Sequence, residues 1–493
     1  MAITGTARTR VAPPGTPTPR PNPGVMTRRL RFGYASGSLV TGTFTTLPGL
    51  LLLPYLTDTL GVGAALAGVI VFVPKAWDAV LNPFVGRASD RTRTRWGARR
   101  PYVLGGGLAM ALAFALTFAG PLPGTAGAWF TAAGYLLTAT AFAFFQVPYV
   151  AMPAELADRE ADRMRLVGGR VAVIGVAALV TGGVAPALVE AGGGGLAGHR
   201  WVGVFGATII ALGALWVFAG TAKGAAATRT GKATGTSASV PTSASAPVPV
   251  PTPVPALTPA AGPTPAPTPT PTPANEPTLR EQFAAARSNP PFMALLRCVV
   301  VQSVATGVLL AGAPYFAEHV LHDSSGVGAL VAAFVAPNLL TMPLWQRLRG
   351  PRGYTVASTL FAVGCLLFLA APVLPEGAVL LSMALAGTGH AGQLLFLYAM
   401  LPDCIARDTA RTERRQAGVL SGVFTTGEGL GVALGPFLYG LVLQLSGYVS
   451  SGTGHAAEQS ATAELGMLVG FATLPALATV AAVLLLRAYD RPY

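Results

Sequence analysis

The chain has 493 residues, of which 52% are hydrophobic and 11% charged, and its net charge is +13. Because soluble globular domains carry about 25% charged residues, this composition excludes a soluble globular protein. The positive charge would also suit nucleic-acid binding, but the arginines cluster in short segments between apolar runs, which is typical of a membrane protein.

Residues 1–30 contain prolines and arginines but no apolar core, which predicts a disordered cytoplasmic tail and not a secretory signal peptide. Two sets of apolar runs follow, each run long enough for the roughly 20 helical residues that cross a bilayer. The first set lies near 31–56, 63–86, 101–121, 128–152, 166–190 and 201–222. The second set lies near 292–317, 326–348, 353–374, 377–401, 416–446 and 465–487. Such runs are too long for barrel strands, so the sequence predicts an all-α membrane protein with 12 transmembrane helices in two six-helix halves.

Residues 223–277 separate the two sets and consist largely of Pro, Thr, Ala, Ser and Val. Such a segment cannot bury a core, so we expect an extended cytoplasmic linker, with binding of a proline-recognition domain as the alternative. Residues 278–283 predict a short amphipathic helix on the inner membrane surface. The expected parts are therefore a tail (1–30), a first half (31–222), a linker (223–277) and a second half (278–493).

The distribution of basic residues predicts the orientation in the membrane. Arg200 is the single lysine or arginine in the short segments that we expect outside, whereas the segments expected inside hold nearly all the others. Positively charged loops mark the cytoplasmic side. We therefore expect a multi-pass protein of the plasma membrane with both termini in the cytoplasm.

Few features of the chain suggest a cofactor or an enzyme. Cys298, Cys365 and Cys404 have no metal-ligand spacing and are expected to be small core residues. The sequence has no P-loop, no His-Glu-x-x-His and no Gly-x-Ser-x-Gly. We expect no enzymatic activity and no cofactor apart from a coupling ion, H⁺ or Na⁺, so transport would use an ion gradient or run downhill. The expected partners are a small-molecule substrate and the lipid bilayer, without nucleic acid, and the monomer is expected to be functional.

The second predicted span carries Lys75, Asp78 and Asn82 at i, i+3 and i+7, which places them on one helical face. Charges in hydrocarbon are costly and usually functional, so this face should point into the bundle. Asp78 could bind a cation or a proton, Lys75 could neutralise it when the site is empty, and Asn82 could supply a carbonyl oxygen. The alternative is a buried pair that only fixes packing.

Further polar residues lie at depth in other spans. Gln146 in the fourth span and Arg170 in the fifth are candidates for substrate binding, since a guanidinium can hold hydroxyls, a carboxylate or a phosphate, or could pair with Asp78. In the second half, Gln393 and Glu428 are the corresponding candidates. The polar residues at depth in that half are Arg297, Gln302, His390, Gln393 and Glu428, and some of them are expected to form plain interhelical hydrogen bonds.

A gate is predicted at the cytoplasmic ends of the spans. Gly86 permits close helix approach, Asp90 can pair with a neighbouring helix, and Arg91 and the arginines after it can anchor at lipid headgroups. Asp403 ends the tenth span in a segment, 398–403, that echoes residues 149–155 at the end of the fourth, and it is expected to act in the same gate. Two such halves suit alternating access around a site at the midplane.

These segments resemble the glycoside–pentoside–hexuronide:cation symporter family of the major facilitator superfamily. The resemblance is carried by Trp77–Pro83 with Gly86, Thr94–Pro101, Val147–Tyr149 with Glu155–Leu156, the Arg163…Arg170 spacing, Leu401–Asp403 and Thr412–Gly418. It extends from about residue 31 to the end, excluding the linker, and implies the major facilitator fold.

The resemblance also implies roles for individual positions. Asp78 matches the first of two second-span aspartates that form the cation site of sodium-coupled members, but the second position is Asn82. Arg170 matches the family's fifth-span arginine, and Gln146 stands at a sugar-binding aspartate. The remaining departures are Val150 at a tryptophan, Gly42 near the first-span aspartate, and Gly429 at the eleventh-span lysine. A single carboxylate favours a proton, or no coupling, over Na⁺.

Three functions are consistent with the sequence. The first is H⁺- or cation-coupled symport of a sugar or other small polar solute. The second is export of amphipathic compounds or drugs on the same fold, for which Asn82 and Val150 would provide a roomier cavity. The third is a non-transporting sensor that signals through the linker, which predicts that deletion of 230–275 abolishes function.

Overall fold

The computed structural model describes residues 27–157, 160–222, 287–323, 326–345, 347–348, 350–412, 417–452 and 457–490. The predicted tail up to residue 26, the linker and the expected amphipathic helix at 278–283 lie outside these ranges. Within them the regular structure is entirely helical, and 11 helices are long and apolar enough to cross a membrane. A shorter apolar helix, Val327–Asn338, accompanies them. The predicted all-α membrane fold is confirmed.

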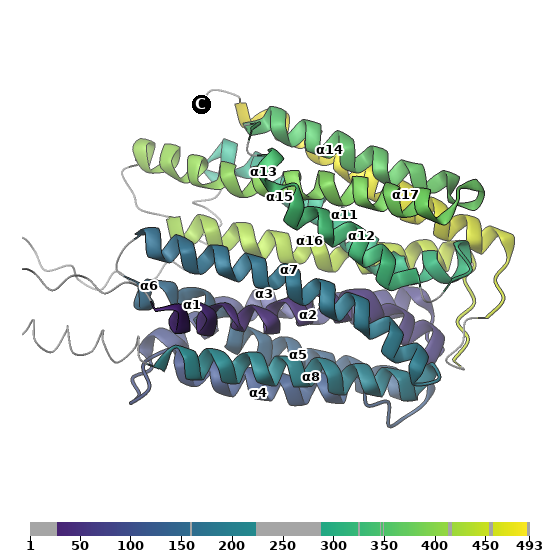
Figure 1. Ribbon diagram of the computed structural model, residues 1–493, viewed down its shortest axis with the longest axis horizontal. Coiled ribbons are helices and arrows are strands. Elements are labelled where there is room, and N and C mark those ends of the chain that lie inside the picture. The colour runs from purple at the N-terminus through teal and green to yellow at the C-terminus, as the bar shows by residue number, and fades with distance from the viewer. Residues whose placement is uncertain are drawn as a thin grey trace, which may run out of the picture.

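The helices follow the predicted spans in chain order (Figure 1). The first group consists of α1 (Arg28–Ala35), α2 (Gly37–Pro54), the π-helix η1 (Tyr55–Thr59), α3 (Ala64–Arg91), α4 (Arg100–Thr117), α5 (Gly124–Ala151), α6 (Pro153–Leu156), α7 (Glu160–Ala191) and α8 (Gly195–Gly220). The second group consists of α11 (Pro290–Tyr315), the π-helix η2 (Phe316–Val320), α12 (Val327–Leu340), α13 (Met342–Trp345), α14 (Gly350–Leu367), the 3-10 helix η4 (Phe368–Val373), α15 (Glu376–Thr412), α16 (Ala417–Leu445), α17 (Ala461–Leu486) and the 3-10 helix η5 (Arg487–Asp490).

The eighth span departs from the prediction of one continuous helix over 326–348. α12 ends at Leu340, and the chain bends at Thr341 before the short α13. Pro337 and Pro343 flank this point, and proline lacks the N–H that would continue the helical ladder. The Thr341 amide and hydroxyl both donate to the Pro337 carbonyl oxygen, which caps the end of α12.

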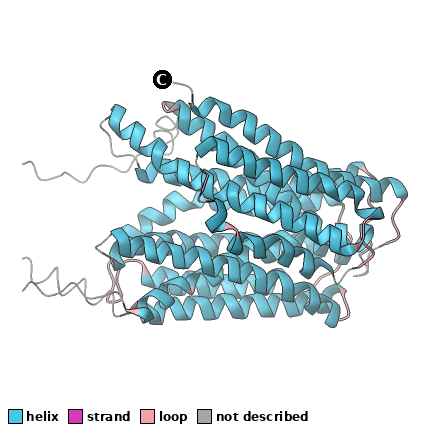
Figure 2. Cartoon of the chain, turned by 45° about the horizontal axis from the view of Figure 1, so that its top comes forward, coloured by secondary structure: helices cyan, strands magenta, loops and turns pink. Residues whose placement is uncertain are grey.

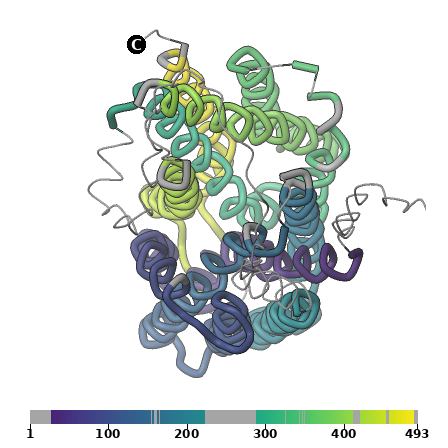
Figure 3. Tube along the Cα trace, turned by 90° about the vertical axis from the view of Figure 1, so that its left-hand side faces the viewer, coloured from purple at the N-terminus to yellow at the C-terminus, as the bar shows by residue number. Residues whose placement is uncertain are grey.

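The bundle has two ends that differ in charge. We call the end that carries the loop between α3 and α4, with Arg91–Arg100, the basic end, and the end that carries the loops 60–63 and 446–460 the far end. Viewed from one end of the bundle in Figure 3, the purple-to-blue helices α1–α8 and the green-to-yellow helices α11–α17 occupy opposite sides. The helix axes run between the two ends, as the cartoon in Figure 2 also shows.

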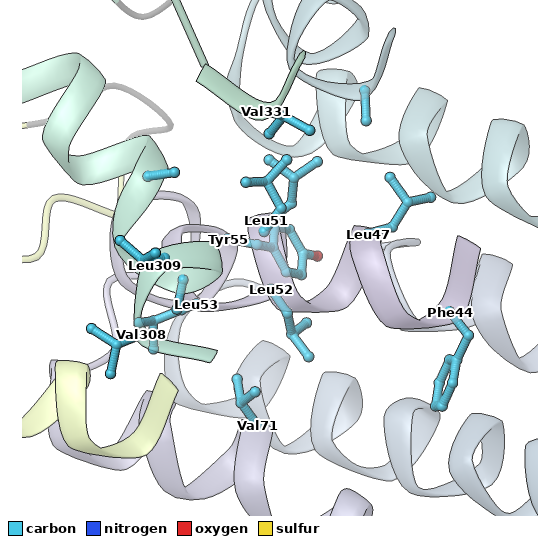
Figure 4. Close-up of a cluster of buried hydrophobic side chains, with 14 of the residues drawn as sticks. Phe44, Leu47, Leu51, Leu52, Leu53, Tyr55, Val71, Val308, Leu309 and Val331 are labelled. Atoms are coloured by element: carbon cyan, nitrogen blue, oxygen red, sulfur yellow. The ribbon is translucent and has the colours of Figure 1, made fainter. Parts of the chain in front are cut away.

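The two halves pack tightly toward the far end. The most extensive contacts between the halves join α3 with α16, α7 with α12, and α2 with α11. α3 and α16 approach so closely that a Cβ at Gly440 would lie 2.6 Å from the Ala64 carbonyl oxygen. In Figure 4, Leu51 and Leu53 of α2 share one apolar cluster with Val308 and Leu309 of α11. In Figure 2 the halves are more widely spaced at the basic end.

The three cysteines meet the expectation of core residues. Cys298, Cys365 and Cys404 are free and buried. A buried thiol behaves as a small apolar group, which fits their positions on α11, α14 and α15.

Candidate transport site

The polar face of α3 points into the first half, as the spacing of its residues predicts. The Lys75 ammonium lies 3.5 Å from the centroid of the Phe44 ring on α2 and 5.4 Å from that of Phe142 on α5. Aromatic faces attract a cation through their quadrupole, and the attraction is strongest away from water. Lys75 forms no ion pair with Asp78, although it is near enough to act on the Asp78 charge. The Lys75 ammonium thus makes a cation–π contact, and its neutralisation of Asp78 stays a prediction.

Asp78 keeps an acceptor atom without a donor. Its Oδ1 is buried and accepts no hydrogen bond from the described residues. An unsatisfied buried acceptor costs about 1–3 kcal/mol, so this atom is suited to a proton or to a ligand cation. Asn82 lies one helical turn further on and is half-buried, and the phenol of Tyr135 on α5 is near enough to be affected by the Asp78 charge.

The donor set around Asp78 is small. The described part of the chain contains no cluster of three or more His, Cys, Asp or Glu side chains that could hold a metal ion. One carboxylate and one amide oxygen offer fewer ligands than a hard cation normally takes from protein. The residues therefore fit a proton better than Na⁺.

A second polar group lies in the second half, near enough to Arg170 of the first half to be affected by its charge. Tyr398 on α15 donates its hydroxyl to Glu428 Oε2 on α16 at 2.7 Å. Arg170 on α7, in the other half, acts electrostatically on both side chains. Its guanidinium carbon lies 5.6 Å from the Tyr149 ring centroid, and its Nε is buried without a hydrogen-bond partner. Arg170 and Glu428 thus present opposite charges across the seam between the halves without forming an ion pair.

Space remains beside these side chains. Tyr398 is 47% exposed, and the charge of Arg170 acts on it. Gly429, beside Glu428, has open space where a Cβ would project. A guanidinium, a carboxylate and a phenol around an accessible space can bind the hydroxyl groups of a polar solute.

The other two predicted substrate-binding residues differ in burial and in hydrogen bonding. Gln146 accepts a hydrogen bond from Thr41 Oγ1 at 2.8 Å, which links α5 to α2, and it remains half-buried. Gln393 is fully buried. Its Oε1 accepts from Gln302 Nε2 at 2.9 Å, and its Nε2 donates to Ser358 Oγ at 3.2 Å. Because these bonds join α15 to α11 and α14, we propose that Gln393 stabilises the second half.

The structure shows the surroundings of two positions that depart from the family pattern. A Cβ at Gly42 on α2 would lie 2.6 Å from the Ala177 Cβ on α7, so a larger side chain would separate these helices. Val150, by contrast, is 45% exposed on α5. Gly42 is therefore a close-packing position between α2 and α7, whereas Val150 presents an exposed apolar side chain.

Of the predicted gate residues, the structure describes the surroundings of Gly86, Arg91 and Asp403, so the gate itself stays a prediction. A Cβ at Gly86 would have only one neighbour, Val147 Cγ1 at 3.6 Å, which is ordinary contact, so close helix approach does not require glycine here. Arg91 and Asp403 are exposed. The side chain of Asp90 lies outside the described part of the structure.

Two arginines of the loop fold inward instead of extending toward headgroups. Arg99 pairs with Glu155 at 3.1 Å and donates to the Ala151 carbonyl oxygen at the end of α5. Arg100, which is buried, donates to the Phe218 carbonyl oxygen near the end of α8. The carbonyl oxygens at a helix C-terminus lack partners within the helix and attract cations. The expectation of headgroup anchoring was therefore wrong for Arg99 and Arg100.

One residue of this group, Tyr398, was not among the predicted site residues, although the sequence contained a signal for it. Tyr398 and Tyr149 occupy equivalent places in the echo between 149–155 and 398–403, and both lie beside Arg170 in the structure. The far-end residues Asp58 and Tyr448, which are hydrogen-bonded to each other, were also missed, because nothing in the local sequence brings them together.

Helices that cross the membrane in two halves, with opposing charges on the seam between them, define a secondary transporter. The sequence matches the MFS/sugar transport protein family over residues 33–245 and 261–491. The chain belongs to this family and, within the major facilitator superfamily, to the glycoside–pentoside–hexuronide:cation symporters.

Individual relatives agree with this assignment. The chain is 23% identical to the uncharacterized symporter YnaJ of Bacillus subtilis over 473 residues, which cover 93% of this chain and 91% of that protein. It is 31% identical over 186 residues to YagG of Escherichia coli, named as a candidate glycoside/cation symporter, covering 38% of this chain and 40% of that protein. Among solved structures, a bacterial homologue of the human lysosomal transporter Spinster, inward-facing and unoccupied, superposes with a TM-score of 0.62 at 15% identity. That superposition covers 94% of this chain and 96% of the other, and it shows a shared fold.

Proposed function

We propose that this secondary transporter couples the symport of a sugar or another small polar solute to a cation, H⁺ rather than Na⁺. The observation that carries the proposal is the pair of opposite charges that Arg170 and Glu428 supply from the two halves, together with the buried Asp78 oxygen in the first half. Arg170 and Glu428 would hold solute hydroxyls from both halves. Solute binding would then favour closure of the seam, as alternating access requires.

Coupling would occur at Asp78. The carboxyl has a buried oxygen without a donor, and Lys75, held against Phe44, supplies a positive charge in the same half. Proton binding at Asp78 would remove the charge that makes a conformational change in an apolar core costly. Since the residues supply a single carboxylate, a proton meets the needs of the site better than Na⁺ does.

The orientation follows from the positive-inside rule. The basic end, with Arg91–Arg100, would face the cytoplasm, and the far end would face outward. We therefore infer an inward-open conformation, since the halves pack at the far end and spread at the basic end (Figure 2). The plasma membrane, cytoplasmic termini and a functional monomer are part of the same proposal, as is the division into tail, two halves and linker.

The test is substrate-induced proton movement in vesicles that contain the purified protein. Sugars and glycosides are added one at a time, and the external pH is recorded with and without Na⁺. External alkalinisation with one sugar, lost in Asp78→Asn, is the expected result. If no sugar produces a response and a lipophilic cation is instead moved outward, the coupled-symport proposal is refuted and export of amphipathic compounds takes its place.

A further inference from the structure

The far-end contact between the halves contains a buried carboxyl group. Asp58 lies in η1, directly after α2, and is 8% exposed. Tyr448, in the segment after α16, donates its hydroxyl to Asp58 Oδ1. Asp58 belongs to the first half and Tyr448 to the second, so this hydrogen bond joins the halves directly.

Other hydrogen bonds surround this one and also cross between the halves. Ser451 Oγ donates to the Asp58 carbonyl oxygen at 2.8 Å, and Ser450 Oγ donates to the Val62 carbonyl oxygen at 2.8 Å. The hydroxyls of Thr57 and Tyr315 lie 2.8 Å apart. We call this set of contacts, formed by residues 57–62 with Tyr315 and residues 448–452, the far-end latch. The latch can exist only while the far end is closed.

The side chains that face Asp58 supply no compensating positive charge. From the segment after α16 comes Tyr448, and from α11 and η2 come Tyr315 and Glu318. Glu318 acts on Asp58 as a like charge. On its own element, Thr57 is the neighbouring polar side chain. All these groups are neutral or acidic.

The basic side chains at this end of the bundle contact groups other than Asp58. His319 packs edge-on against the Tyr448 ring, with centroids 5.7 Å apart, and His322 is near enough to act on His319. His199 on α8 contacts Thr59 Oγ1 and the Gly195 carbonyl oxygen through its Nδ1. Arg200 donates to the carbonyl oxygens of Ala119 and Gly120. Among the described residues, no cation therefore balances a charge on Asp58.

The free-energy cost of forming the latch thus depends on whether the Asp58 carboxyl is ionised or protonated. A buried carboxylate without a cation is expensive, whereas a buried carboxylic acid with a hydrogen-bonding partner is not. Burial and the adjacent Asp58 carboxylate raise the pKa of Tyr448 well above its usual value, so Tyr448 stays protonated and remains the hydrogen-bond donor. When the far end opens, water can solvate the carboxylate.

We propose that Asp58 is a proton-binding site of the outer gate, which takes up a proton from the far side as the latch forms and returns it to the same side as the latch opens. The inference rests on the proposed alternating-access function but is separate from coupling at Asp78. Because the Asp58 proton returns to its own side, it contributes nothing to net proton transport. It sets the balance between the two conformations instead.

The sign of the pH dependence follows from linkage. A group that binds its proton more tightly in the closed state stabilises that state at low pH, and the stabilisation is lost as the pH rises. Acid on the far side is therefore expected to close the far end, and alkali to open it. Removing the Glu318 charge should make ionised Asp58 easier to bury, so the closed far end should persist to higher pH.

The test measures the far-end separation directly, without substrate. Nitroxide labels are attached at Leu122→Cys and Val373→Cys, which replace exposed far-end residues of the first and second halves. The three native cysteines are buried, so labelling favours the new sites. Distance distributions of the full chain in lipid nanodiscs are recorded from about pH 5 to about pH 8, a range that spans carboxyl groups shifted upward by burial.

The expected result is a shift from short to long distances as the pH rises. Asp58→Asn should keep the short distances throughout the range, because the amide is neutral and can still accept from Tyr448. Tyr439→Phe is the matched control, since that hydroxyl donates to the Met467 carbonyl oxygen within the second half and its loss should leave the pH dependence unchanged.

Two outcomes would overturn the proposal. One is a wild-type distribution that does not change with pH, and the other is an unchanged pH dependence in Asp58→Asn. Neither depends on whether sugar transport is observed, so failure of this proposal is distinguishable from failure of the proposed symport. In the second outcome, loss of the pH dependence in Glu318→Gln would assign the proton to Glu318.

Discussion

Replacement of Gly440 by alanine is expected to open the far end of this transporter. Gly440 lies on α16, where an added Cβ would come within 2.6 Å of the Ala64 carbonyl oxygen on α3. Because the obstructing atom belongs to the backbone, the two helices have to separate before the methyl group fits. Overpacking of this kind costs about 1–3 kcal/mol. The cost arises only while the halves are in contact, so the closed far end should lose population by roughly 5- to 150-fold.

The matched control is Gly183→Ala on α7. Gly183 also lies at the seam between the halves, but a Cβ there would have no neighbour within 4 Å. Both substitutions replace a helical glycine by alanine, which favours the helix by up to about 1 kcal/mol in either conformation and does not change the balance between them. The steric contact is therefore what distinguishes the two variants.

The label pair at positions 122 and 373 provides the assay, at a pH where the unsubstituted protein has the far end closed. Gly440→Ala should add a long-distance population that Gly183→Ala lacks. Identical distributions in Gly440→Ala and the unsubstituted protein would refute the reasoning, because the contact would then not limit the closed state. Equal shifts in both variants would refute it as well.

Three further predictions concern the site and the basic end. Asp78→Asn should abolish gradient-driven accumulation while leaving solute binding or exchange partly intact, and unchanged accumulation in vesicles would exclude the coupling role. Glu428→Gln and Arg170→Gln should each weaken solute binding by roughly 10- to 150-fold, because each removes one charge-assisted hydrogen bond of about 1.5–3 kcal/mol. Affinities measured by calorimetry that stay within twofold of the original protein would contradict the site. Arg99→Ala should destabilise the fold by about 1–3 kcal/mol and lower the melting temperature, because it breaks the Glu155 pair and a helix-end hydrogen bond. The control, Arg91→Ala at an exposed position, should change the stability by no more than about 0.5 kcal/mol. Equal melting temperatures for the two arginine variants would count against the helix-end role.

The helices could be predicted from the sequence because the bilayer leaves few alternatives. A run of apolar residues in lipid has to satisfy its backbone hydrogen bonds internally, so each such run predicts a helix whatever its neighbours are. The prediction of a continuous span was wrong at Thr341, after which Pro343 cannot continue the ladder of α12. That proline was visible in the sequence, but helices with internal proline are common here, as Pro48 in α2 and Pro186 in α7 show.

The site could be predicted only in part. Spacing along α3 placed Lys75 and Asp78 on one inward face, since helical geometry fixes which residues share a side. It could not predict that Lys75 would lie against Phe44, because that contact depends on how α2 packs against α3. In the same way, sequence alone did not distinguish Gln393, which is sealed between helices, from Glu428, which lies at the seam.

By itself, then, the sequence determined the class of protein, the number and order of its apolar spans and the residues able to carry charge at depth. These properties are local, because each follows from composition or from spacing within one helix. Which polar groups meet was decided by the packing of the helices: Arg170 with Glu428 across the seam, and Asp58 with Tyr448, 390 residues further along the chain, in the far-end latch. Such pairings depend on the relative positions of the two halves, which a transporter has to change in order to work.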